Sequence, residues 1–407
     1  MPEIKGMNFL KRKLASKQAR IKMRYTFYES KNIMFDFNIS TPPDLRNWSS
    51  SLGWCAKAVD SIADRLQFKE FRNDVFDMTE IFNANNPDIL FDGAILDALI
   101  SSCSFIYISK DADGYPRMQT IDGYNATGII DPFTYLLTEG YAVLSRNANG
   151  DPIDEAYFLP GITYFYRNGK TYTTEKSSSM YAMLVPIIHR PDAIRPFGRS
   201  RITRACMSHV GSALRTIKRS EISAEFYSYP QKYLVGVSEE TAQLDKWKST
   251  IATLLAITKD EDGDVPHVGQ FTQQSMQPHV EQLKMFAALF AGETGLTLDD
   301  LGFATENPSS NEAIKAQHEN LRLAARKAQR YFSVGFMNAG FLAACVRDEY
   351  AYNRGQVFNT KTVWYPIFEP DAAALSSIGD GAIKINQAVP DFFNKETLSD
   401  LTGIDYE

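Results

Sequence analysis

The spacing of apolar residues predicts helices in the first hundred positions. Beyond Thr41, apolar side chains recur every three or four residues and make one helical face, at Trp48, Leu52, Cys55, Val59, Ile62 and Leu66. Pro42 and Pro43 end whatever precedes this helix, because proline cannot continue a helix. A second apolar run, from Phe91 to Cys103, predicts a second helix.

Between about Phe105 and Leu184 the pattern changes to short β-branched and aromatic runs separated by turn residues. An Asp-Gly or Asn-Gly pair between two such runs is the strongest short-range signal for a β-hairpin. Three such pairs occur, at Asp113-Gly114, Asn149-Gly150 and Asn168-Gly169. We therefore predict an antiparallel β unit over this region.

From Ser200 the helical period returns and continues until Pro230. One side of this helix is apolar, with Ile202, Ala205, His209, Ala213, Ile217 and Ala224, and the bases lie largely elsewhere, at Arg201, Arg204, Arg215, Lys218 and Arg219. A single long helix of this kind needs partners to cover its apolar side.

The next stretch predicts a strand over 232–237, a helix over 238–257 and an acidic loop over 258–271. Pro278 then begins another helix that continues to Ala291, and Gly292 stands at the usual position of a left-handed helix cap.

A polar, irregular stretch separates that helix from the longest predicted helix. Two glycines, three acids and a proline indicate irregular structure over 295–310. Ser309 and Glu312 then have the spacing of a capping box, which predicts a helix start. That helix can continue to Val346, with Gly335 and Gly340 as bend points. A strand over 361–368 and a short helix after Asp371 complete the prediction.

Composition indicates a folded protein in a cytosol-like compartment. The chain has 407 residues, of which 44% are hydrophobic and 12% aromatic, enough for a substantial core. Neither a membrane-spanning run nor a signal peptide is evident. The four cysteines, Cys55, Cys103, Cys206 and Cys345, are too widely spaced for a metal or disulfide framework, so we interpret them as buried small hydrophobic residues.

Charge is unevenly distributed along the chain, although the net charge is only −6. Residues 1–24 carry eight bases and one acid, whereas residues 348–407 carry ten acids and four bases. A loose, solvated arm is the simplest interpretation of the basic N-terminal segment.

Short motifs that suggest a ligand have simpler explanations. Gly169-Lys170-Thr171 lacks the earlier glycine of a phosphate-binding loop, because Tyr164 stands there. The Asp-rich stretches at 111–114 and 260–264 lack the ligand spacing of a calcium loop. The five histidines show no metal-ligand spacing. We therefore expect neither a metal nor a cofactor.

Catalytic motifs are absent from the sequence, but a hydrolase with a dispersed active site remains an alternative. Its residues would be His189, Asp192 and Ser200, brought together by the fold.

Several segments in order resemble the portal proteins of tailed bacteriophages, of the siphophage head type. The central match comprises 197–236 and 292–321, and shorter matches lie at 50–71, 97–116 and 363–385. No single motif is diagnostic. The resemblance depends on the matching segments following the same order over nearly the whole chain. Many relatives carry a glycine where this chain has Ser102 and Cys103.

The resemblance implies an α+β portal fold with a helical stem, an α/β clip, a wing with an antiparallel β unit and a long kinked helix, and a partial crown. The implied parts are an N-terminal arm and wing at 1–198, stem helix 1 at 199–228, the clip at 229–277, stem helix 2 at 278–295, the tunnel loop at 296–308, the long wing helix at 309–346, and the wing return with the start of a crown at 347–407.

Family likeness also implies which residues carry function. Residues lining a DNA channel in the tunnel loop would be Thr297, Asp299, Asp300, Thr305, Glu306 and Asn307. Residues docking other proteins at the clip would be Lys259, Asp260, Glu261, Asp262 and Asp264. The stem would present Arg201, Arg204, Arg215, Lys218 and Arg219. Acids beside the bore would repel phosphates, so that DNA slides instead of binding tightly.

As a portal, the chain would be a non-enzymatic ring of usually twelve copies, located at the portal vertex of the virion and in the host cytoplasm during assembly. Its partners would be the terminase large subunit, a head–tail adaptor, the major capsid and scaffolding proteins, and double-stranded DNA bound without sequence preference; no membrane is implied. Another phage head structural protein is the remaining alternative.

Overall fold

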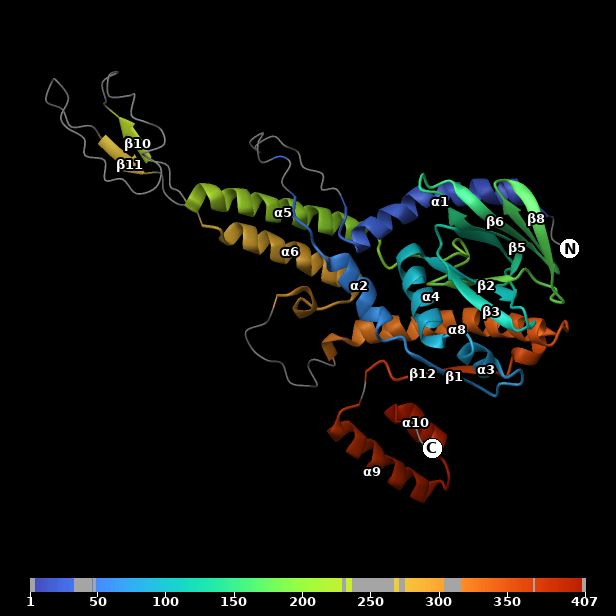
Figure 1. The fold of residues 1–407 in the computed structure, drawn as a ribbon. Coiled ribbons are helices and arrows are strands. Elements are labelled where there is room, and N and C mark those ends of the chain that lie inside the picture. The colour runs from blue at the N-terminus through green and yellow to red at the C-terminus, as the bar shows by residue number, and fades with distance from the viewer. Residues whose placement is uncertain are drawn as a thin grey trace. The chain divides into compact units, whose positions relative to one another are not determined.

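The computed structural model describes residues 4–32, 46, 49–228, 232–235, 267–270, 275–303, 316–368 and 370–404 (Figure 1). These residues divide between two compact units. The larger unit comprises 1–32, 53–207 and 292–407, and the smaller comprises 33–52 and 208–291. The fold is α+β, as the sequence predicts.

Two antiparallel sheets and one strand pair form the β structure of the larger unit. A five-stranded sheet has the order β4-β5-β6-β7-β8, a three-stranded sheet has the order β3-β2-β9, and β1 pairs with β12. Their bounds are β1 Phe68–Arg72, β2 Cys103–Lys110, β3 Pro116–Ile121, β4 Ala126–Ile130, β5 Leu137–Arg146, β6 Pro152–Leu159, β7 Ile162–Arg167, β8 Lys170–Lys176, β9 Leu184–Ile188 and β12 Lys361–Trp364.

The three predicted hairpins are confirmed. Their turns join β2 to β3, β5 to β6, and β7 to β8, and the glycines Gly114, Gly150 and Gly169 have positive φ. The third turn also accounts for the phosphate-loop-like triplet, because Asn168 and Gly169 connect two paired strands. Ser102 has a φ of 99° immediately before β2. Glycine would adopt that conformation without steric cost.

Among the described residues of this unit, six helices and two short 3₁₀ turns accompany these sheets, besides the long α8. The helices are α1 Met7–Tyr28, α2 Trp54–Ala63, α3 Met78–Asn83, α4 Pro87–Ser101, α9 Ala372–Ala388 and α10 Lys395–Thr402, and the turns are η3 Asp299–Leu301 and η4 Arg354–Val357. The helices α2, α4 and α9 match predictions. Neither α3 nor α10, the two shortest of these helices, was predicted.

The long helix α8, Glu319–Arg347, is at the centre of the aromatic core. Phe336 packs edge-on against Phe91 of α4, with ring centroids 4.4 Å apart. Gly335 and Gly340 lie within one uninterrupted helix, at points of close approach: a Cβ on Gly335 would lie 2.6 Å from Ile187 of β9. The predicted capping box at 309–312 lies outside the described residues.

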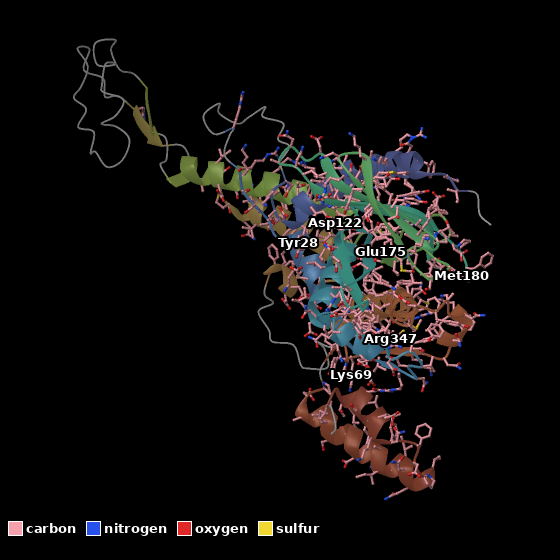
Figure 2. All side chains as sticks on the ribbon, turned by 45° about the vertical axis from the view of Figure 1, so that its right-hand side comes forward. Tyr28, Lys69, Asp122, Glu175, Met180 and Arg347 are labelled. Carbon is pink, nitrogen blue, oxygen red and sulfur yellow. The ribbon has the colours of Figure 1, made fainter. Side chains whose placement is uncertain are left out.

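The basic N-terminal segment is a packed helix, so the prediction of a loose arm is wrong. Leu10 and Leu14 of α1 pack against aromatic residues of β5 and β6. The side chain of Glu139 accepts hydrogen bonds from the backbone of Lys5 and Gly6 just before α1. The dipole of a helix stabilises a carboxylate at its N-terminal end. Near the other end, the hydroxyl of Tyr28 donates to Asp60 at 2.9 Å (Figure 2).

Several lysines of α1 lie against the protein instead of in solvent. Lys13 and Lys17 donate to the carbonyls of Gly128 and Ala126, at 2.7 and 2.8 Å. Burial, reinforced by the charge of Lys17, lowers the pKa of Lys13 to about 8. The basic run therefore contributes hydrogen bonds that hold α1 against β4, and its stems cover apolar surface.

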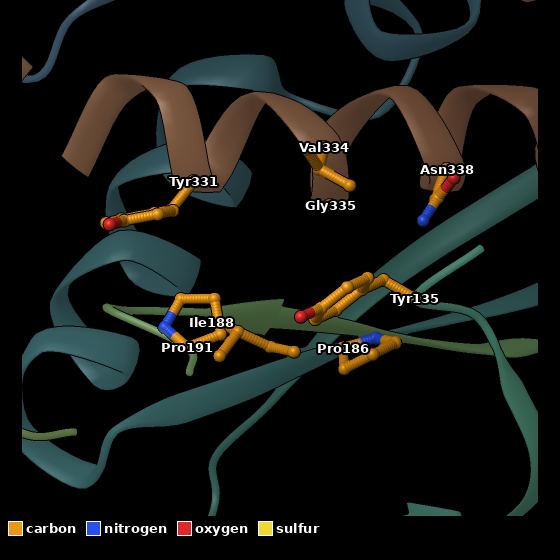
Figure 3. A pocket seen from close by; sticks show the side chains of 8 residues that line it. All are labelled: Tyr135, Pro186, Ile188, Pro191, Tyr331, Val334, Gly335 and Asn338. Carbon is orange, nitrogen blue, oxygen red and sulfur yellow. The ribbon is translucent and has the colours of Figure 1, made fainter. Parts of the chain in front are cut away.

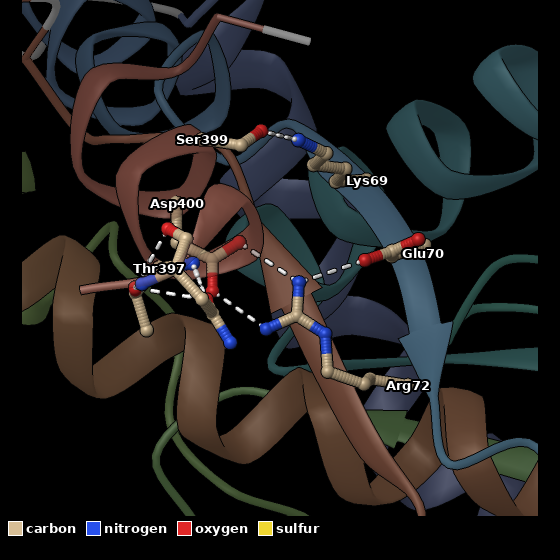
Figure 4. Close-up of polar contacts among 7 residues, drawn as sticks. Lys69, Glu70, Arg72, Thr397, Ser399 and Asp400 are labelled. Carbon is tan, nitrogen blue, oxygen red and sulfur yellow. Dashed lines mark hydrogen bonds and ion pairs between the residues drawn. The ribbon is translucent and has the colours of Figure 1, made fainter. Parts of the chain in front are cut away.

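Polar contacts join the C-terminal helix α10 to strand β1 (Figure 4). Arg72 makes a bidentate ion pair with Asp400, at 2.6 and 2.9 Å, and a further bond to Glu70. Lys69 donates to Ser399 at 2.8 Å. By contrast, Ala382 is the one buried residue of α9.

The smaller unit contains most of two helices and a strand pair. The helices are α5 Arg204–Ser228 and α6 Gln277–Thr294, and β10 Lys232–Val235 pairs antiparallel with β11 His267–Gln270. Both predicted helices are confirmed, but the predicted cap is wrong. Gly292 lies inside α6, and the glycine with positive φ is Gly295, at 69°. The helix predicted over 238–257 lies outside the described residues.

Candidate functional site

The two helices implied as a stem bond to each other through polar side chains. Thr216 of α5 donates to Gln282 of α6 at 3.0 Å, and Ser223 lies 3.5 Å from the Nε2 atom of His279. Apolar residues of both helices are buried: Val210, Ala213 and Leu214 on α5, and Ala287, Phe290 and Ala291 on α6. The pair is therefore a two-helix element with a small apolar seam.

The five bases implied for the stem surface do not share one environment. Arg204 and Arg219 are exposed, and Arg215 donates to Ser212 at 2.9 Å. Lys218 is 2% exposed and donates to the backbone carbonyl of Arg46 at 2.8 Å. The prediction that these bases lie outside the apolar side is therefore wrong for Lys218, and it is also wrong for Arg201.

Arg201 is buried near the start of α5 and the end of α6. Its guanidinium donates to the carbonyl of Ala58 at 3.1 Å and to that of Thr294, the last residue of α6. Its backbone N–H donates to Leu99. Burial lowers the pKa of Arg201 to about 10. A cation beside the terminal carbonyl of a helix is favourable, so this side chain joins α2, α4 and the end of α6.

The first half of the implied tunnel loop is an ordered turn. The backbone N–H and hydroxyl of Thr297 both donate to Asp300, and the N–H of Asp300 donates back to the Thr297 hydroxyl at 3.2 Å. His318, the N-cap of α8, lies 3.4 Å from the same carboxylate. The expectation of irregular structure is therefore wrong for 296–303, where a reciprocal side-chain cap was not recognised.

The acids of this turn differ in accessibility. Burial alone would raise the pKa of Asp300, but hydrogen bonds from Thr297 and the nearby His318 outweigh burial, so the pKa lies below its ordinary value. Asp299 is exposed at the start of η3. The other implied tunnel residues, Thr305, Glu306 and Asn307, lie outside the described residues.

None of the acidic clip residues can be placed. Lys259, Asp260, Glu261, Asp262 and Asp264 all lie outside the described residues. What the structure describes of the implied clip is the β10–β11 pair, with Lys232 opposite Gln270 and Val235 opposite His267. The sequence predicted the first of these strands and missed the second.

The three residues of the alternative hydrolase do not form a catalytic arrangement. His189 is 2% exposed, and its Nδ1 atom lies 2.7 Å from the carbonyl of Arg199. Burial lowers the pKa of His189 to about 3. Asp192 pairs with Arg199, and the Ser200 hydroxyl donates to the carbonyl of Ile100 at 2.6 Å. Each group already has a structural partner, so no nucleophile–base pair exists here.

The described residues also show where other chemistry is missing. The four cysteines are buried and outside disulfides, as the sequence predicts. In the described part of the chain, no three potential metal-binding side chains come together. Among the same residues, no helix is long and apolar enough to cross a membrane.

Comparison with solved structures gives two weak similarities. A chain from the virion of a native gene transfer agent particle has a TM-score of 0.46 at 12% identity, covering 95% of this chain and all of that one. A chain from the neck of an empty gene transfer agent particle has a TM-score of 0.45 at 11% identity, covering 91% of this chain and 96% of that one.

Comparison with curated proteins identifies relatives over most of the chain. No family model matches. The portal protein of Mycobacterium phage D29 is 24% identical over 389 residues, which cover 88% of this chain and 77% of the relative. The portal protein of Mycobacterium phage L5 is 23% identical with the same coverage. Both names indicate a structural, non-enzymatic protein. Over most of its length, the chain is therefore similar to the portal proteins of these two tailed phages.

Proposed function

We propose that this chain is the subunit of a ring at the portal vertex of a phage capsid, and that double-stranded DNA passes through the ring during packaging and ejection. The observation that carries this proposal is the match to two portal proteins over 88% of the chain. By analogy with the family, the ring has twelve copies. It assembles in the host cytoplasm and remains in the virion.

Exposed apolar side chains on α6 support association between copies. Met285 and Leu289, one helical turn apart, are each about half exposed, and the buried Ala287 and Ala291 lie on the opposite side of the helix. Long apolar side chains gathered on one exposed face favour a protein contact. We infer that this face packs on a neighbouring subunit.

Asp299 is the acid we assign to the DNA channel among the described residues. Asp299 is exposed, and an acid on the wall of a channel repels phosphates, which favours sliding over binding. Asp300 has a different role, because its carboxylate holds Thr297 and lies beside His318. We therefore assign Asp300 to shaping the turn that presents Asp299.

Docking of other proteins is assigned to the implied clip. Residues 259–264 carry four acids and one base, a charge pattern suited to a basic partner surface. We propose that this segment contacts the terminase large subunit during packaging and the head–tail adaptor afterwards, while other surfaces meet the major capsid and scaffolding proteins.

Light scattering and negative-stain imaging of the purified full chain test the ring directly. The expected result is a particle several times the mass of the 45.8 kDa chain, with a central hole. A protein that stays monomeric at all concentrations would refute the portal assignment, and would favour another kind of head protein.

Charge reversal at Asp299 tests the channel. Asp299→Lys places a cation beside the bore, so it should hold DNA and lower packaged genomes about tenfold while rings still assemble. Asp113→Lys, in an exposed hairpin turn, is the matched control and should package normally. Normal packaging by Asp299→Lys would remove this residue from the channel.

A further inference from the structure

An apolar cavity of about 230 Å³ lies between α8 and β9 in the larger unit (Figure 3). Tyr331, Val334 and Asn338 line it from α8, and Pro186, Ile188 and Tyr135 line it from the facing side. A cavity of about 150 Å³ already admits a benzene-sized group. This cavity can therefore accept a branched aliphatic side chain.

The walls of the cavity are held in place by hydrogen bonds and backbone conformation. Asn338 donates to the carbonyl of Thr134 at 3.1 Å and accepts two bonds from Arg354, at 3.0 and 2.7 Å. Tyr135, a bulky residue, has a φ of 59°. Such strain persists only where the surroundings fix it, so the cavity is preformed.

Exposed cations precede the cavity residues along α8. Arg326, Lys327 and Arg330 are exposed, and they lie one or two helical turns before Val334, on the same side of the helix. Arg190 is exposed beside the cavity residue Pro191. None of these four cations forms an ion pair with another described residue. The rim is therefore basic, and its charges are available to a partner.

A complementary feature stands on α4 of the same unit. Ile89 is 77% exposed, and the acids Asp88 and Asp92 flank it on one exposed side of the helix. Burial, followed by the negative charges of Asp88 and Asp64, raises the pKa of Asp92. Ile89 is thus an exposed apolar side chain beside acids. Below, Ile89 is called the knob, and Asp88 and Asp92 are called its acidic border.

The knob and the cavity lie on opposite sides of the α4–α8 layer. Phe91 and Phe336 point toward each other across that layer, with ring centroids 4.4 Å apart. Two residues along a helix correspond to a rotation of about 200°. Ile89 and Val334 each stand two positions from these rings, so they point away from each other. One copy cannot bring its own knob to its own cavity.

We propose that Ile89 of one copy inserts into the cavity beside Val334 of the next copy, with the acidic border of the knob against the basic rim. The partner is a second copy of this chain because the two surfaces match in polarity and charge. This inference rests on the proposed ring and specifies one of its subunit contacts. Opposite charges around an apolar centre fix both the register and the direction of the contact.

Cysteine crosslinking tests the contact in assembled rings. Ile89→Cys combined with Val334→Cys should give a ladder of linked chains on a non-reducing gel after mild oxidation, because all native cysteines are buried. Each single substitution is the control and should give at most background dimers. Intact rings without a ladder would overturn this contact and leave the ring proposal standing. Absence of rings in the unaltered protein would overturn both.

Charge reversal provides an independent measurement. Asp92→Lys and Arg330→Asp should each weaken ring assembly about tenfold or more, because each places like charges together. The doubly substituted chain restores an opposite pair and should regain assembly. Asp113→Lys controls for the change in net charge. If the losses of assembly from the two reversals add in the doubly substituted chain, these two residues do not meet in the ring.

Discussion

Replacing Arg201 by methionine tests whether this one buried cation fixes the junction at the base of the two helices. Methionine keeps a long side chain that can fill the site but donates no hydrogen bond. The substitution removes the bonds to Ala58 of α2 and Thr294 of α6. Because the guanidinium is 7% exposed, water cannot replace those bonds.

The expected loss follows from two opposing contributions. Each hydrogen bond from a charged donor contributes about 1.5–3 kcal/mol, or roughly 3–6 kcal/mol for two. Burial of the charge opposes them: the pKa of Arg201 falls from 12.5 to about 10, which corresponds to about 3 kcal/mol against the charged form. Methionine loses the bonds and avoids the burial cost. The difference is about 0–3 kcal/mol, so the free energy of unfolding should fall by ~1.5 kcal/mol, the middle of that range.

Urea unfolding followed by tryptophan fluorescence measures this loss near the site. Trp54 is buried in α2, one helical turn before Ala58. With a slope of ~3 kcal/mol per molar urea, the midpoint should fall by about 0.5 M. Arg204→Met, three residues away and exposed, should leave the midpoint unchanged. Equal midpoints for the two variants would refute the structural role of Arg201.

Two further predictions concern pH and the C-terminal helix. Burial lowers the pKa of His189 to about 3. Below pH 6.5 the unfolded chain therefore binds a proton that the folded chain does not bind. The free energy of unfolding should fall by about 3 kcal/mol between pH 7 and pH 4. His189→Phe should remove that pH dependence in urea titrations, and an unchanged dependence would contradict it. Arg72→Ala breaks the bidentate pair with Asp400 and should speed limited proteolysis around α10 several-fold, whereas Lys69→Ala, which loses one bond, should have a smaller effect. Equal cleavage rates would count against the ion pair as the main attachment.

Local sequence signals predicted the elements whose formation depends on neighbours along the chain. The Asn168-Gly169 turn fixes a hairpin because both residues adopt positive φ, and the proline at 278 marks the start of α6 to within one residue. The same signals misplaced the end of α6. Gly292 was predicted as the cap, but Gly295 is the residue with positive φ, and a Cβ there would lie 3.3 Å from Asn320.

Long-range contacts explain what the sequence could not predict. The basic run around Lys13 looked like a solvated arm because lysine is normally exposed, yet its amine reaches a carbonyl 115 residues away. The positions of Leu10, Leu14 and Ile21 carried a partial signal, since they lie on one side of a helix. Arg201 was recognised as a base, but its burial depends on three helices that are distant in sequence.

Symmetry gives the contact between Ile89 and the α8 cavity a consequence for assembly. In a twofold dimer the same patch must serve both partners, which requires the knob and the cavity to share one face. Here they lie on opposite faces of the α4–α8 layer, so each added copy leaves a new knob at one end and a new cavity at the other. Such head-to-tail contacts continue until the last copy meets the first, and they end in a closed ring when the rotation per subunit permits closure. The separation of acid on α4 from base on α8 therefore favours cyclic assembly over a closed pair.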